Sequence, residues 1–365
     1  MNGVSARSGD AFFLNLRFLL IVCVFAANAL EPLIYVSSLA DRWYTWIFMF
    51  HMPLFVWVTG YFTRPNLKGE TGVKTLLQIM VQYIIFQSLY SLLDAAFFHV
   101  QGVHHSFFAP YLLLWFLASH FCWRLLLLAM RRLSPSIQIT GSIVLGTLAG
   151  YIPFEGTWLS ISRTFVFLPF FVLGYHITYE KISFLLTPRF RSAAIAGSLL
   201  MLAAAVWTSA HLQTGWLYGS MTFAGLGHGE WYAGLFRIGI YLLQLAASAA
   251  FLGFVPFAAG WLSRLGSRTL YVFLLHGFII RGAASLGIYA YIHTTFGTLC
   301  VMIVACLLTV LLALPAVKRA VHPLIEPNVG WIFKRISKIS SSFKKHFFKR
   351  SDLLWHEIAH KSGKN

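Results

Sequence analysis

Four side chains capable of ionic or acid–base chemistry stand out inside apolar segments of this sequence. They are Arg17, His51, His120 and His276. An ionisable group in hydrocarbon costs at least about 2.5–3.5 kcal/mol, so each one needs a partner or a task. Arg17 stays charged and therefore needs an anion, several acceptors, or a route for its head group to the interface. A neutral His can either hydrogen-bond to a neighbouring helix or act as a general base, and the sequence leaves both alternatives open.

The spacing of these residues indicates where they face. Asn28 follows Arg17 by eleven residues, and eleven steps of about 100° return to within about 20° of the same helix face, about 16 Å further along. That face offers a cation at one end and an amide at the other. His51 lies near the centre of the next apolar segment, where Pro53 lacks a backbone N–H and is expected to bend the helix. His276 lies near the middle of a later segment. The pattern suggests a polar site inside a helical bundle.

The elements that must position these side chains are membrane helices. The chain has 365 residues, of which 58% are hydrophobic, 17% aromatic and only 11% charged, whereas about 25% of residues are charged in soluble domains. Apolar runs long enough to cross about 30 Å of hydrocarbon recur throughout, and predict an all-α polytopic membrane protein with about ten transmembrane helices. The predicted spans are 12–30, 43–62, 74–98, 107–129, 137–152, 161–178, 192–209, 232–257, 268–290 and 296–315.

The net charge of +17 follows the predicted topology. If both termini are cytoplasmic, nearly all Lys and Arg residues fall in segments on the cytoplasmic side, as the positive-inside rule requires. The exceptions lie inside helices or at their outer ends, and are Arg17, Arg42, Arg163, Arg237 and Arg281. We therefore expect a multi-pass protein of the cell (plasma) membrane that binds no nucleic acid. A cleaved signal peptide is the alternative for the first segment, but Arg17 interrupts its apolar run.

The composition changes at Lys318. We expect a transmembrane domain over residues 1–317 and a basic cytoplasmic tail over 318–365. Within Trp331–Arg350, apolar residues recur at helical spacing among Lys and Arg, which predicts an amphipathic helix lying on anionic membrane lipids. The four cysteines show no metal-ligand or disulfide pattern, so neither a metal site nor a disulfide is expected.

Several ordered strings carry a resemblance to a known family. They are Phe13–Ile21, Glu31–Pro32, Phe50–Tyr61, Leu114–Leu117, Arg163–Tyr175 and Leu275–Gly277. With these strings the chain resembles the integral-membrane acyltransferase family 3, especially its fucose 4-O-acetylase-like branch, from about Phe12 to Ala316.

This resemblance implies transfer of an acyl group, usually acetyl, from cytoplasmic acyl-CoA. The acceptor would be a hydroxyl of an extracytoplasmic glycan or lipid-linked sugar, such as a cell-surface polysaccharide of the cell envelope. The family's signature in the first helix is an Arg followed, after ten intervening residues, by a His. Arg17 matches, but Asn28 stands at the position of the His. Asn cannot shuttle a proton, so the chain must use another base, such as His51 or His276, use Asn28 only to orient the substrate, or have lost catalysis. We favour His51 over His276, because it shares a bent helix with Thr59 and its neighbours form the longer family string.

The resemblance also suggests roles for other residues. A central His would deprotonate the sugar hydroxyl, and the developing oxyanion would be met by Asn28 or Thr59. Arg17 would hold the acyl-CoA, the donor substrate, from the cytoplasmic side. The candidates for binding the acceptor on the outer side are Glu31, Trp115 and Arg163. An ordinary interfacial or packing role is the alternative for these three.

Two other functions remain open. The first is a catalytically silent relative that binds, flips or exports a glycan or lipid, because a fold does not fix a function. The second is an unrelated secondary transporter, which the absence of a visible internal repeat disfavours.

Overall fold

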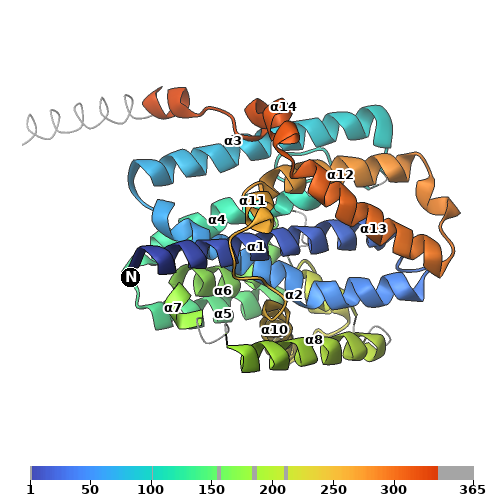
Figure 1. Cartoon of the computed structure of the whole chain (residues 1–365), viewed down its shortest axis with the longest axis horizontal. Helices are drawn as coiled ribbons and strands as arrows, with labels where there is room; N and C mark the ends of the chain where they lie inside the picture. Colours follow the sequence, from blue (N-terminus) through green and yellow to red (C-terminus); the bar gives the residue numbers. More distant parts are fainter. Residues whose placement is uncertain (1, 101, 154–157, 183–186, 209–212, 336–365) are drawn as a thin grey trace, which may run out of the picture.

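The computed structural model describes residues 2–100, 102–153, 158–182, 187–208 and 213–335. These residues form helices and connecting loops, and no strand occurs among them. Most of the long helices run side by side in roughly the same direction (Figure 1). The long helices are α1 Asn2–Leu30, α2 Ser38–Thr63, α3 Gly69–Leu93, α4 Trp115–Ala129, α5 Pro135–Leu148, α6 Ile161–His176, α8 Pro188–Thr208, α10 Ala233–Leu252, α12 Thr269–Ser285 and α13 Thr295–Leu312. The short ones are α7 Tyr179–Ile182, α9 Gly215–Tyr218, α11 Trp261–Gly266 and α14 Pro315–Ile325.

The helices confirm the prediction of an all-α polytopic membrane protein. Six of them, α1, α2, α3, α4, α10 and α13, form spans that are long and apolar enough to cross a bilayer, and α6 and α12 are shorter apolar helices. Helices α5 and α8 occupy the fifth and seventh predicted spans. Several helix ends differ from the predicted bounds by five residues or more, and two of them have a clear local cause. The fourth span begins at a turn, Leu112–Leu114, because Pro110 precedes it, and α10 ends at Leu252 because Gly253 and Pro256 follow.

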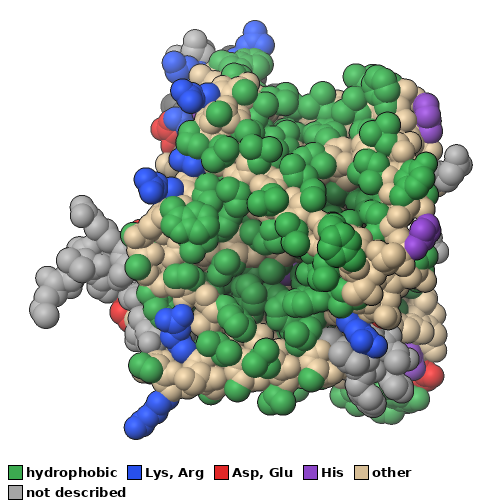
Figure 2. Space-filling view, turned by 45° about the vertical axis from the view of Figure 1, so that its right-hand side comes forward, with side chains coloured by type: hydrophobic (Ala, Val, Ile, Leu, Met, Phe, Trp, Pro, Cys, Tyr) green, Lys and Arg blue, Asp and Glu red, His purple; other side chains and the backbone are tan. Residues whose placement is uncertain are grey.

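The surface has the distribution of side chains that a bilayer requires. Figure 2 shows apolar side chains over the middle of one face, most Lys and Arg side chains along one edge, and His side chains along the opposite edge. Large apolar residues of α10 and α13 are well exposed, for example Leu242 at 65% and Leu307 at 64%. Such exposure is costly in water but natural against lipid chains.

Helix α1 lies in the middle of the bundle, packed against α2, α11, α12 and α13 (Figure 1). The most extensive contact between two of the described helices joins α2 and α6. A Cβ atom at Gly60 would collide with the carbonyl oxygen of Phe171, and one at Gly174 would collide with the carbonyl oxygen of Trp57. The two helix backbones therefore touch at these glycines, as small residues allow in membranes. This contact fixes α2, which carries His51, against α6, which carries Arg163.

The first part of the predicted tail packs against the bundle. Helix α14 begins before the expected boundary at 317 and runs past it. The Gln82 side chain of α3 donates a hydrogen bond to the carbonyl of Ile325, N···O 2.7 Å. The Tyr271 hydroxyl of α12 donates to Glu326, O···O 2.5 Å. Most of the predicted amphipathic helix Trp331–Arg350 falls in residues 336–365, outside the described residues.

Candidate functional site

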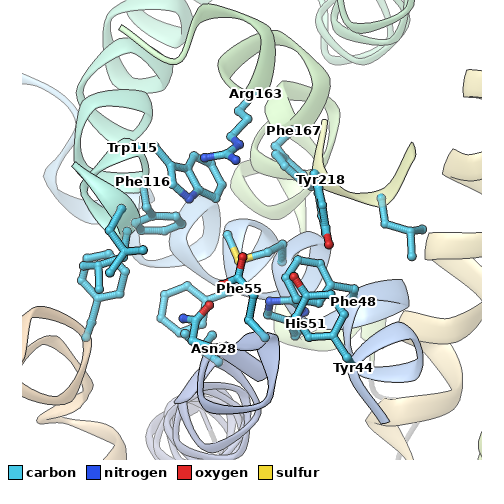
Figure 3. Close-up of a pocket in the computed structure, with 17 residues that line it drawn as sticks. Asn28, Tyr44, Phe48, His51, Phe55, Trp115, Phe116, Arg163, Phe167 and Tyr218 are labelled. Atoms are coloured by element: carbon cyan, nitrogen blue, oxygen red, sulfur yellow. The ribbon is translucent and has the colours of Figure 1, made fainter. Parts of the chain in front are cut away.

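A cavity of about 210 Å³ opens between α1, α2, α4, α6 and the short helix α9. We call it the outer cavity, because it lies toward the helix ends that the charge pattern predicts to face outside. Figure 3 shows the side chains that line it, including Asn28, His51, Trp115 and Arg163. Glu31 belongs to the same lining. Five of the residues predicted from the sequence to form a site therefore lie around one cavity.

Helix α2 supplies one continuous face of this cavity. Tyr44, Phe48, His51 and Phe55 follow one another at helical spacing and all line it. The His51 side chain is 3% exposed, and its Nδ1 lies 2.8 Å from the carbonyl oxygen of Ile47. Since a carbonyl can only accept, Nδ1 carries the proton and Nε2 keeps a lone pair. Among the described residues Nε2 has no hydrogen-bond partner, so it can accept a proton from a group in the cavity.

The second central histidine is engaged differently. His276 is fully buried, and its Nδ1 lies 3.0 Å from the carbonyl oxygen of Val272 and 2.9 Å from that of Phe273. Its Nε2 lies 3.1 Å from Nδ2 of Asn28, which must be the donor because Nδ1 already holds the imidazole proton. The lone pair of His276 is thus occupied, and His276 is not among the residues that line the outer cavity. Asn28 keeps a second amide hydrogen and its carbonyl for the cavity.

The rim of the outer cavity combines charges with aromatic faces. The guanidinium carbon of Arg163 lies 4.9 Å from the centre of the Trp115 ring, a cation–π contact. Glu31 is exposed at the rim, where Arg163 and Arg281 both attract its charge. Burial raises the pKa of the Tyr218 phenol further above neutral pH, and the protonated hydroxyl can donate a hydrogen bond. Such a rim suits a polyhydroxylated ligand with an apolar ring face.

A second cavity of about 340 Å³ lies at the other end of α1. We call it the inner cavity; Arg17, Asn66, His120 and Glu326 are among its lining residues. The Arg17 guanidinium lies over the Phe62 ring, 5.0 Å from its centre. Within the described part of the chain it has no hydrogen bond and no ion pair with a carboxylate. A half-buried cation without a protein partner, facing a cavity, is suited to an anionic ligand.

Thr59 lines the inner cavity and does not line the outer one. Its hydroxyl donates to the carbonyl of Phe55, one turn earlier in α2, O···O 2.8 Å. The hydroxyl proton is therefore used within the helix, and of the two predicted oxyanion donors Asn28 retains a free N–H.

His120 also lines the inner cavity, with its buried Nε2 unpaired among the described residues.

The two cavities meet at three phenylalanines. Phe55 of α2, Phe116 of α4 and Phe273 of α12 line both cavities, and no other lining residue is shared. The Phe116 ring lies 5.3 Å from that of Phe55 and 5.5 Å from that of Phe273, each in an edge-to-face arrangement. We call this group the phenylalanine partition.

Some lining residues were not anticipated from the sequence. Tyr44 was open to prediction, because it lies seven residues before His51 and therefore on the same face of α2. Tyr218 and Glu326 gave no such signal. Tyr218 comes from a short helix in an outer loop, and Glu326 from the segment that the composition assigned to the tail.

Comparison with known proteins agrees with the resemblance seen in the sequence strings. The sequence model of the acyltransferase 3 family, described as an acyltransferase domain, matches residues 11–317. No curated protein and no solved structure gave a significant match. The match covers more than half of the chain, from α1 to the start of α14, and includes both cavities except Glu326. The protein therefore belongs to the integral-membrane acyltransferase family 3.

Proposed function

We propose that the protein is an O-acyltransferase of the cell (plasma) membrane with both termini in the cytoplasm. It moves an acyl group, acetyl in the simplest case, from cytoplasmic acyl-CoA to a hydroxyl of an extracytoplasmic glycan or lipid-linked sugar. The observation that carries this proposal is the position and hydrogen bonding of His51. Its ring is fixed by the Ile47 carbonyl, and its open Nε2 lies in a cavity that only aromatic rings separate from the cavity of Arg17.

The charge pattern supports an inner cavity on the cytoplasmic side. Asn66, which lines that cavity, lies in the basic connection that carries Arg64 and Lys68. By the positive-inside rule such a connection faces the cytoplasm. The phosphates of acyl-CoA require cations, and Arg17 offers one that has no ion-pair partner among the described residues. The outer cavity would then receive the acceptor from the opposite side.

The transfer step needs one base and one oxyanion donor. Nε2 of His51 takes the proton of the acceptor hydroxyl while the oxygen attacks the thioester carbonyl. The C–S bond of the thioester breaks, and the CoA thiolate receives a proton from the imidazolium, so that an ester and free CoA are formed. The free N–H of Asn28 stabilises the oxyanion that develops on the carbonyl oxygen. Its bond to His276 holds the amide in place.

The outer rim supports binding of a sugar. Trp115 presents an aromatic ring against which the apolar face of a sugar can stack, while Arg163 and Glu31 provide a donor and an acceptor for its hydroxyls. The cation–π contact between Arg163 and Trp115 orients both side chains before a ligand arrives.

One observation favours the silent-relative alternative. Asn28 stands where the family has a His, and its amide occupies the lone pair of His276, so that this pair offers no base. If His51 is only a packed helix residue, the chain could bind, flip or export a glycan or lipid without chemistry.

Hydrolysis and transfer assays with purified protein in lipid separate these functions. The protein is given acetyl-CoA labelled in the acetyl group, and release of CoA is measured with and without extracytoplasmic glycans. CoA release above that of membranes lacking the protein supports the acyltransferase. Saturable glycan binding without any CoA release would support the silent relative instead.

A further inference from the structure

Among the described residues, the phenylalanine partition is the only group that lines both the inner and the outer cavity. Its three side chains come from three different helices and are 7–8% exposed. Each ring faces Arg17's cavity on one side and the cavity of His51 on the other. The Phe116 ring packs edge to face against the other two rings, so the three side chains lie together between the two cavities.

We propose that the phenylalanine partition selects the acyl chain by size. Only a short acyl group passes between the rings to reach His51, while a longer chain is held back in the inner cavity. This inference rests on the proposed acyltransferase function and adds to it the side chains that select the acyl chain of the donor.

Packing supplies the physical reason. Turning one ring opens a narrow gap and leaves the other contacts of the partition in place. A longer chain must keep several rings apart during the reaction, and each aromatic pair that is separated costs free energy. The outer cavity, at about 210 Å³, must also hold part of the acceptor, which leaves little room for a long acyl chain.

Phe116 is the member of the partition to change, because its ring contacts both others. Phe116→Ala removes the middle ring. Phe50→Ala is the matched control, because Phe50 is also fully buried in an aromatic stack, 4.3 Å from the Phe251 ring, and lines neither cavity.

The first measurement is the chain-length profile of transfer with acetyl-, butyryl- and octanoyl-CoA. The wild type is expected to prefer acetyl-CoA, and Phe116→Ala to raise the octanoyl-to-acetyl rate ratio by about tenfold, the effect of relaxing a size-selective apolar site. Phe50→Ala should lower all rates together and leave the ratio unchanged. An unchanged ratio in a folded Phe116→Ala protein, or an equal shift in both variants, overturns the proposal.

The second measurement does not depend on activity. In protein whose four native cysteines are replaced, Met52→Cys places a thiol in the lining of the outer cavity. A charged thiol reagent should label it from the outer side only, and from both sides when Phe116→Ala is added but not when Phe50→Ala is added. If the wild type transfers no acyl group, the proposed function fails. In that case only the labelling tests whether the three phenylalanines separate the cavities. Labelling of Met52→Cys from both sides in protein that keeps Phe116 would show that they do not.

Discussion

At the scale of single residues, the hydrogen bonds distinguish two histidines that look alike in the sequence. Both lie near the middle of membrane helices, and both use Nδ1 to donate to a backbone carbonyl of their own helix. Nε2 of His276 accepts from Asn28, whereas Nε2 of His51 is open to the outer cavity. A base needs an unoccupied lone pair within reach of its substrate, so the structure favours His51.

The sequence predicted that the central polar residues form a site and favoured His51 over His276, but it did not show how the hydrogen bonds of the two histidines differ. Asn28 and His276 are 248 residues apart, and their contact depends on how α1 and α12 pack. Nothing in the local sequence of either helix reports that contact. The face shared by Tyr44 and His51, in contrast, follows from helical spacing alone.

His51→Ala is expected to lower acyl transfer by about 10²–10⁴-fold, the usual contribution of a general base. His276→Ala serves as the comparison. It removes a structural hydrogen bond and should lower transfer much less, by disturbing Asn28. Both rates are measured in membranes with equal amounts of protein. Equal loss in the two variants would contradict the assignment of His51 as the base.

Arg17→Ala is expected to weaken binding of acyl-CoA by about 1.5–3 kcal/mol, because a charge-assisted contact is lost. Arg163→Ala removes the same type of side chain from the outer cavity and should leave acyl-CoA affinity unchanged. Isothermal titration of the purified variants measures both. If Arg17→Ala binds acyl-CoA as tightly as the wild type, Arg17 has only the snorkelling role.

At the scale of elements, the site depends on the contact between α2 and α6. Both helices contain a proline within their length, Pro53 and Pro169, and both use a glycine to bring the backbones together. The contact places His51 and Arg163 around the same cavity. Apolar periodicity predicted these long helices well. The short helices α9 and α14 add Tyr218 and position Glu326. Helix α9 has only four residues and α14 is a short basic helix, so neither could be predicted as a membrane span or placed against the bundle.

Gly174→Ala is expected to destabilise the protein by about 1–3 kcal/mol, because the new methyl group would overlap the α2 backbone. Gly141→Ala is the control, since a Cβ atom there has no neighbour within 4 Å. The control should be neutral or slightly stabilising, as Ala favours helix over Gly by up to about 1 kcal/mol. Thermal unfolding in detergent compares the two. A Gly174→Ala protein as stable as Gly141→Ala would contradict the direct helix contact.

At the scale of the whole molecule, the division into an inner and an outer cavity has meaning only if the ends of the bundle face opposite sides of the membrane. We expect single cysteines at His105 and Thr214 to react with an impermeant maleimide from outside, and a cysteine at Ser134 to remain unlabelled in intact cells. The reason is the placement of most Lys and Arg residues on one side. Reaction of all three positions in intact cells would contradict the orientation.

The central claim is that His51 drives acyl transfer across this bundle, and transfer of labelled acetyl groups tests it most directly. Membrane vesicles carrying wild type or His51→Ala receive labelled acetyl-CoA on their cytoplasmic face, and label is measured on glycans at the opposite face. We predict label with the wild type, a loss of about 10²–10⁴-fold with His51→Ala, and a smaller loss with His276→Ala. Full transfer by His51→Ala, or none by the folded wild type with glycan acceptor present, would contradict the account.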